Sequence, residues 1–217
     1  MKTFTAALCV FGLLAGSVAF GQNATQRYAI DASASDLHWL VYKAGTLSRL
    51  GHNHTIAVAD LHGSVWKNDA NLAASKFEME FSVAKLVIDD PTLRSTLGAE
   101  FSSVPTPKDI EGTRGNMLGD KVLDGEKFPT IRIVGTGPVA RDGAQTMAAT
   151  VEILGRSMPL TIPTQVSVDG DVITASGEFE LNHADLGMKP FTVMLGALAV
   201  GEKLSFKYSI KARREAH

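Results

Sequence analysis

Apolar and polar residues alternate over short segments along most of the chain. The segment 36–42, DLHWLVY, places Leu37, Trp39 and Val41 at every second position. Because successive side chains of a strand point to opposite faces, this period of two indicates a strand with one apolar face. Segments with a similar alternation are 76–83, 130–135, 146–154, 155–182 and 203–212. The pattern predicts half-buried antiparallel strands.

The region between residues 85 and 128 breaks this alternation. Its sequence reads as short helices or loops, and Pro91 fits the first turn of a helix with Asp89 or Asp90 as the cap. Two further prolines, Pro105 and Pro107, interrupt any continuous helix. The chain is therefore predicted to be all-β, with a short helical insertion in the middle.

The strands and the turns between them indicate the architecture. A hairpin is expected at Asp169-Gly170-Asp171, between two alternating segments. Repeated strands of this kind are typical of a closed barrel or a sandwich. A closed antiparallel barrel would leave no exposed edge strand, and a barrel of about eight strands is wide enough for one slender ligand.

The first 21 residues differ from the rest of the chain. Lys2 supplies a positive charge, residues 6–14 form an apolar run, and small residues follow. This order is typical of a secretory signal peptide, and the run is too short for a membrane-spanning helix. Cleavage is expected after Gly21 or after Ala19. The mature protein would then be one exported domain, residues 22–217, with no later apolar span of transmembrane length.

Composition and charge narrow the class of partner. The chain has 21 basic and 23 acidic residues, and loss of Lys2 leaves 20 against 23, a net charge of -3. This balance gives no sign of nucleic-acid binding or of a polybasic membrane contact. Cys9 is the only cysteine and leaves with the signal peptide. The mature chain would then have neither a disulfide nor a thiol nucleophile.

Enzyme motifs are missing from the sequence. It contains no G-x-S-x-G, no H-E-x-x-H, no P-loop and no dinucleotide-binding glycine motif. Glu178 and Glu180 share the polar face of one strand, where a solvated surface is favoured over a pair of catalytic acids. The sequence predicts a protein that is not an enzyme.

Four segments together resemble the YceI-like family. They are YAIDASASDLHWLVYKAG (28–45), VADLHGSVWKN (58–68), GDKVLDGEKFPTIRIVG (119–135) and LNHADLGM (181–188). In the last segment the family has an aromatic residue where this chain has Leu186. The likeness extends from about Tyr28 to Ala212, which is nearly all of the expected mature chain.

This resemblance implies a single lipocalin-like antiparallel barrel of eight strands in a bacterial periplasm. Members of the family hold a polyisoprenoid or a similar amphiphile in an internal tunnel. They are often dimeric, so the resemblance also implies a homodimer. The chain departs from the family at residues 49–56, RLGHNHTI, where members carry mostly apolar and small residues.

The histidines of this departing segment are candidate site residues. Val58 matches an inward position of the family, and counting back by twos places Ile56, His54 and His52 on the same inward face. A bulge at Gly51 would reverse this face and send the rings to solvent.

His183 is a third histidine that is expected to point into the barrel. The period of two places His183 on the face of Phe179 and Leu181, whereas His38 and His62 are expected to face outward. Three inward histidines could hold a divalent metal ion. They could equally contact the polar end of a ligand, or serve only as polar residues at the barrel mouth.

Three functions follow from these features. The first is a periplasmic binding or carrier protein that holds an extended amphiphile, polyisoprenoid, quinone-like or fatty-acyl, in the barrel. The sequence indicates no certain cofactor; an isoprenoid or other lipid is a possible bound group, as is a divalent metal. The second is a metal-binding barrel with His52, His54 and His183 as ligands. The third is a structural envelope protein that acts through a protein partner. The expected ligand-binding residues are Leu37, Trp39, Val41, His52, His54, Ile56, Val58, Phe77, Met79, Phe81, Phe179, Leu181, His183 and Phe206.

Overall fold

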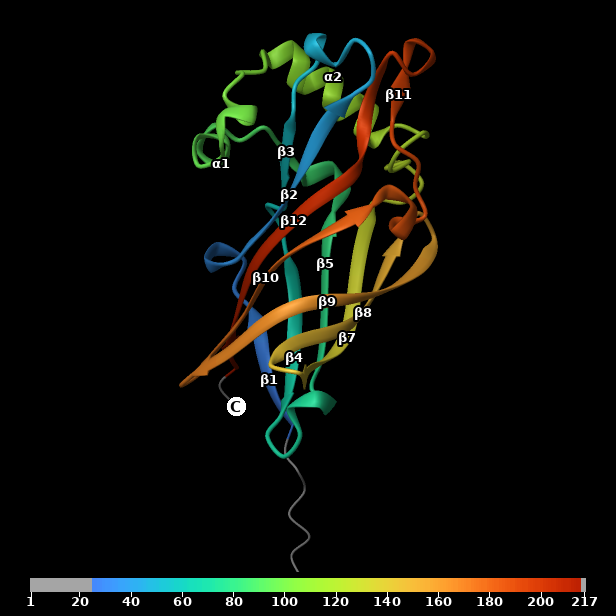
Figure 1. Ribbon diagram of the computed structural model, residues 1–217. Coiled ribbons are helices and arrows are strands. Elements are labelled where there is room, and N and C mark those ends of the chain that lie inside the picture. The colour runs from blue at the N-terminus through green and yellow to red at the C-terminus, as the bar shows by residue number, and fades with distance from the viewer. Residues whose placement is uncertain (1–24, 216–217) are drawn as a thin grey trace, which may run out of the picture.

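The structure is a computed structural model that describes residues 25–215 (Figure 1). The predicted signal peptide lies outside these residues. Among the helices that are described, none is long and apolar enough to cross a membrane.

Eight antiparallel strands form a closed barrel, which confirms the predicted all-β fold and selects the barrel over the sandwich. Neighbouring strands follow the order β1-β4-β5-β7-β8-β9-β10-β12, and β12 pairs with β1 to close the ring. Closure pairs the two strands that would otherwise be edges. The predicted hairpin joins β9 to β10, with Val172 opposite Asp169. The strands are β1 (Thr25–Ile30), β4 (His62–Asn68), β5 (Lys76–Ser82), β7 (Thr130–Arg141), β8 (Ala144–Ile153), β9 (Arg156–Asp169), β10 (Val172–Asn182) and β12 (Leu198–Arg214).

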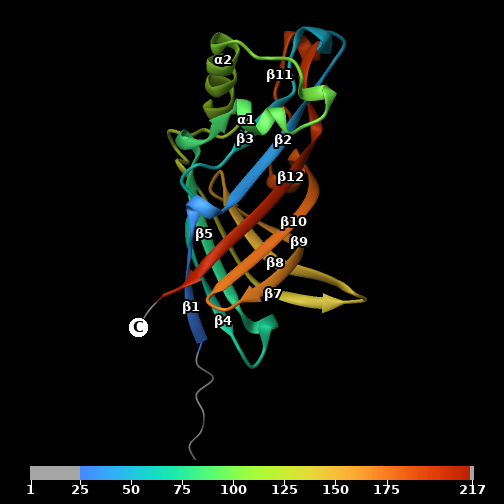
Figure 2. The ribbon, with the colours of Figure 1, turned by 90° about the vertical axis from the view of Figure 1, so that its left-hand side faces the viewer.

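The last strand, β12, is long enough to pair with two neighbours on one side. Its C-terminal part pairs with β1, and its earlier part pairs with β2 (Asp36–Ala44). In turn, β2 pairs with β3 (His54–Ala57), and β3 pairs with β6 (Val87–Ile88). A short strand, β11 (Thr192–Val193), also pairs with β12. These strands extend one end of the barrel, at the top of Figures 1 and 2.

The helical insertion lies at the same end of the barrel (Figures 1 and 2). It contains α1 (Pro91–Ser95) and α2 (Pro107–Leu118). As predicted, Pro91 begins α1, and the Asp90 side chain accepts a hydrogen bond from Leu93 N at 2.9 Å. Thr106 and Asp109 form a capping box on α2. Short 3-10 turns are η1 (Ala32–Ala34), η2 (Ser48–Leu50), η3 (Leu72–Ala74), η4 (Val83–Lys85), η5 (Ala99–Phe101), η6 (His183–Leu186) and η7 (Met194–Gly196).

The apolar faces of the strands fill much of the barrel interior. Phe77, Phe81, Ile131 and Val151 are buried there. The backbone of β7 passes close to the Phe77 ring at Gly135, where an added Cβ would lie 2.4 Å from Phe77 Cζ. A glycine at this position therefore lets the large ring of Phe77 turn inward.

Candidate functional site: an apolar cavity with one polar end

The barrel encloses a cavity of about 260 Å³. Inward side chains of the strands form its wall, and residues of α2 line it from the end that carries the insertion. Twelve of the fourteen expected ligand-binding residues line this cavity: Leu37, Trp39, Val41, His54, Ile56, Phe77, Met79, Phe81, Phe179, Leu181, His183 and Phe206. The other two, His52 and Val58, lie outside its lining.

A row of aromatic rings forms one wall of the cavity. On neighbouring strands, Phe206 lies opposite both Trp39 and Phe179. The ring of Phe206 stacks on Trp39 at a centroid distance of 5.7 Å and on Phe179 at 5.2 Å. Tyr208 meets Phe179 edge to face at 6.2 Å. This row gives the cavity a fixed apolar surface across β2, β12 and β10.

The polar side chains at the insertion end of the cavity come from different elements. Thr113 and Asn116 lie three residues apart on α2 and therefore share one face of the helix. His54 Nε2 lies 3.5 Å from Thr113 Oγ1. His183 is buried, and its Nδ1 lies 2.9 Å from the backbone oxygen of Glu202. The cavity thus has one end with hydrogen-bonding groups and a predominantly apolar remainder.

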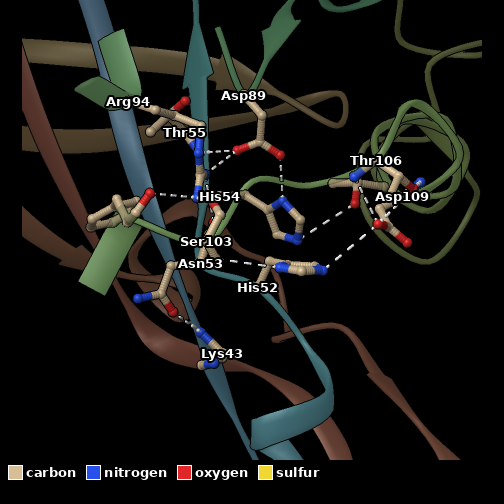
Figure 3. A network of polar contacts seen from close by, with 12 residues as sticks. Lys43, His52, Asn53, His54, Thr55, Asp89, Arg94, Ser103, Thr106 and Asp109 are labelled. Atoms are coloured by element: carbon tan, nitrogen blue, oxygen red, sulfur yellow. Dashed lines mark hydrogen bonds and ion pairs between the residues drawn. The ribbon is translucent and has the colours of Figure 1, made fainter. Parts of the chain in front are cut away.

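His54 is held by a buried acid (Figure 3). Its Nδ1 lies 2.7 Å from Asp89 Oδ2, while Asp89 Oδ1 accepts hydrogen bonds from Thr55 N at 3.0 Å and from Arg94 at 2.6 Å. Burial alone raises the pKa of Asp89, but the hydrogen bonds from His54 and Thr55 and the neighbouring positive charges outweigh it and lower that pKa. Asp89 is therefore a carboxylate, which can only accept, and it keeps a proton on His54 Nδ1.

Arg94 fixes the position of this acid. Besides Asp89, its guanidinium donates to the backbone oxygens of Asn53 at 2.8 Å, Phe101 at 2.9 Å and Ser103 at 2.7 Å. The side chain is 7% exposed, so these bonds replace nearly all of its contact with water. Arg94 thereby ties α1 to the segment before β3 and to the loop that leads to α2.

The structure places His52 outside the cavity lining, although its ring lies beside that of His54 at a centroid distance of 6.3 Å. Strand β3 begins at His54, so the alternation of a strand does not extend back to His52. The His52 ring instead faces α2, with Nε2 3.7 Å from Asp109 Oδ2 and Nδ1 3.4 Å from Ser103 Oγ (Figure 3). Val58 similarly follows the end of β3 and packs against the core without lining the cavity. His54 itself points inward, as expected.

The three histidines do not come together as a ligand set. Within residues 25–215, no group of three or more His, Cys, Asp or Glu side chains could hold a metal ion. His54 on β3 lies opposite Val41 on β2, Val41 lies opposite Leu204 on β12, and Leu204 lies opposite Leu181 on β10. Leu181 precedes His183 by two residues. Three strand spacings of about 4.8 Å each separate the outer strands. Metal ligands must instead lie within about 2 Å of a single ion.

The remaining histidines lie away from the cavity. His62 is exposed, as expected for an outward position. His38 also points away from the cavity, but it is only 4% exposed, and its Nδ1 lies 2.8 Å from Asp36 Oδ2. Alternation gives the face of a residue but not how far neighbouring side chains cover it.

The two acids of β10 lie on the outer surface. Glu178 and Glu180 each pair with a lysine of β12, Lys207 and Lys203, at 2.7 Å. Side-chain hydrogen bonds from these lysines, and their charges, lower the pKa of both glutamates. The structure therefore supports the solvated surface over a catalytic pair.

Much of the cavity wall was missed by the sequence analysis. The inward residues of β7, β8 and β9 belong to it, as do Leu204, Tyr208 and Ile210 of β12. Their segments alternate between apolar and polar residues, so the sequence did indicate which side chains point inward, but these residues were not predicted to bind a ligand. The contact of Asp89 with His54 and that of Arg94 with Asn53 had no such signal, because these partners lie 35 and 41 positions apart along the chain.

A closed antiparallel barrel around an apolar cavity is the fold of a lipocalin-like protein. The chain belongs to the YceI-like domain family, whose model matches residues 28–212. None of the curated proteins compared with the chain matches it significantly.

Three solved structures show the same fold at low sequence identity. BcnA from Burkholderia cenocepacia has a TM-score of 0.60 at 13% identity and covers 84% of this chain and 98% of its own. A polyisoprenoid binding domain from Saccharophagus degradans, implicated in plant cell wall breakdown, has a TM-score of 0.58 at 12% identity, with 87% and 98% covered. The YceI protein of Campylobacter jejuni has a TM-score of 0.51 at 12% identity, with 75% and 85% covered.

Proposed function

We propose that this protein is an exported, periplasmic binding or carrier protein that holds one extended amphiphile, polyisoprenoid, quinone-like or fatty-acyl, inside its barrel. The observation that carries the proposal is the apolar cavity with its aromatic wall. Each Å² of apolar ligand surface removed from water contributes about 25 cal/mol. The family and the polyisoprenoid-binding Saccharophagus degradans domain of the same fold support this class of ligand.

The proposal is one of binding and not of catalysis. Burial of a hydrocarbon chain needs no reacting group, and the cavity wall consists mainly of aliphatic and aromatic side chains. The polar groups at one end can orient the ligand without changing it chemically.

Native mass spectrometry of protein purified from the periplasm tests this function. An excess of several hundred daltons that solvent extraction removes is expected, and the denatured mass reports whether residues 1–21 have been cleaved. Met79→Asp places a charge on the cavity wall and should abolish the excess. Glu80→Asp, on the exposed face of the same strand, should retain it. Leu181→Gln, a milder change of the wall, should lower it if Met79→Asp does not fold.

The result that contradicts the proposal is a native mass equal to the denatured mass, or a bound excess that both cavity variants retain. The same spectra address the two other hypotheses. An excess of one divalent metal ion, lost in His54→Ala, would favour the metal-binding barrel. A ligand-free barrel recovered with a protein partner would favour the structural role. A native mass of twice the chain would show the homodimer that the family resemblance implies.

A further inference from the structure

The cavity wall contains no side chain with a permanent charge. Among the described residues, its lining includes no Asp, Glu, Lys or Arg. Its polar members are two histidines, one threonine, one asparagine and one tyrosine. An ionised carboxylate or phosphate placed there without a counter-ion would lose its hydration, and such a loss disfavours binding strongly.

The nearest buried cation is not available to a ligand. Arg94 already donates to Asp89 and to three backbone oxygens, and it does not line the cavity. An anionic ligand end near His54 would therefore also face the buried negative charge of Asp89, which contacts the same ring at 2.7 Å.

The ring of His54 presents a defined atom to the cavity end. Asp89 accepts a hydrogen bond from Nδ1–H, so Nε2 is the ring nitrogen that points to Thr113, and without a proton it is a hydrogen-bond acceptor. Its contact with Thr113 Oγ1, at 3.5 Å, is longer than the usual distance of about 2.8 Å for a hydroxyl donor. A hydroxyl group on the ligand would satisfy Nε2 better than this long contact does. Asn116, which is exposed and lies on the same face of α2, lines the cavity and offers both a donor and an acceptor.

The opposite end of the cavity is apolar. The Tyr208 hydroxyl at this end already donates a hydrogen bond to the backbone oxygen of Pro163 at 2.9 Å, so its proton is not offered to a ligand. Beyond Tyr208 lies a second small cavity of about 70 Å³, which shares Phe77, Met79, Met147, Tyr208 and Ile210 with the first. Its lining is mainly apolar and also includes Lys67 and Lys76. This arrangement gives the ligand a direction, with its tail pointing away from α2.

We infer that the cavity selects an amphiphile whose polar end is uncharged and carries a hydroxyl group, and that His54, Thr113 and Asn116 bind this end. The inference rests on the proposed function and names the head group of its ligand. A long-chain isoprenoid alcohol has this chemistry, whereas its phosphate ester and a fatty-acid anion do not.

The test compares ligands that share one tail. Delipidated mature protein carrying Trp66→Phe is titrated at pH 7.5 with geranylgeraniol, with geranylgeranyl phosphate and with the matching C20 hydrocarbon. Trp39 in the cavity wall is then the one remaining tryptophan, and its fluorescence reports binding. The alcohol should bind at least about tenfold more tightly than the phosphate, and about five- to tenfold more tightly than the hydrocarbon, as expected for one or two net hydrogen bonds.

Variants of α2 and His54 locate the head group. Thr113→Val and Asn116→Leu should each weaken alcohol binding about three- to tenfold and leave hydrocarbon binding unchanged. Glu111→Leu, on the same helix but outside the cavity lining, should change neither. His54→Phe keeps a ring of similar size but removes the acceptor, and it should bring the alcohol to the affinity of the hydrocarbon.

The possible failures are distinguishable. Equal affinity for the alcohol and the phosphate, or tighter binding of the phosphate, would overturn the inference while the proposed function stands. Equal affinity for the alcohol and the hydrocarbon would also overturn it. If none of the three molecules binds and no lipid is found in native spectra, the proposed function itself fails.

Discussion

Phe179 and Phe206 lie face to face on adjacent strands, with ring centroids 5.2 Å apart and planes inclined by 8°. Their contact is direct because the register of β10 and β12 places the two residues opposite each other. Both rings line the cavity, so the same contact stabilises the barrel and shapes the ligand site.

A double-mutant cycle should detect this contact. Phe179→Leu, Phe206→Leu and the double variant keep apolar side chains of similar size but remove the stacking of two rings. We expect a coupling free energy of about 0.5–1.5 kcal/mol in urea unfolding of the ligand-free protein. A coupling indistinguishable from zero would show that the stacking adds nothing beyond apolar burial.

Replacement of the buried acid Asp89 should be among the single substitutions that lower the free energy of unfolding most. Asp89→Asn leaves Arg94 buried without its ion-pair partner, and removing one member of a buried pair costs about 3–5 kcal/mol. The free energy of unfolding in urea measures this cost. Asp90→Asn is the matched control, because it changes only a helix cap and should cost about 1 kcal/mol or less. Similar losses in the two variants would contradict the central role of Asp89.

The junction between β1 and β12 should weaken in acid through Asp31. Its carboxylate accepts hydrogen bonds from Ser33 and Arg213, which lower the pKa of Asp31 from 3.8 to about 2. Because the pKa is lower in the folded state, the unfolded state binds more protons between these values. The contribution of Asp31 is complete above pH 3.8 and is lost as the pH falls toward about 2.

Thermal unfolding of the wild type and Asp31→Asn across this range measures the effect. The wild type should have the higher Tm at pH 5, and the difference should shrink as the pH approaches 2. A difference in Tm that stays constant over this range would contradict the role of the carboxylate charge.

Alternation predicted the barrel because it is a local property. Segments such as 36–42 and 76–83 carry a period of two that survives in the structure as β2 and β5, with Trp39 and Met79 pointing inward. The helical insertion was also readable, because Pro91 and its acidic neighbours set a helix start within a few residues.

The position of His52 shows the limit of predicting side-chain direction by counting residues along a strand. Parity along a strand holds only within the strand, and β3 begins two residues later, at His54. No local pattern marks that boundary. The metal hypothesis depended on the same count, and the register of four strands keeps His54 and His183 apart.

The sequence by itself therefore determined the class of fold, the strands that build it and the inward face of several of them, because side-chain direction in a strand follows from neighbouring residues. Only the tertiary structure decided which polar groups meet. Asp89 reaches His54 across 35 positions of the chain, and α2 brings Thr113 to the same ring from 59 positions away. These contacts depend on how the insertion folds back over the barrel end, which no periodicity along the chain records.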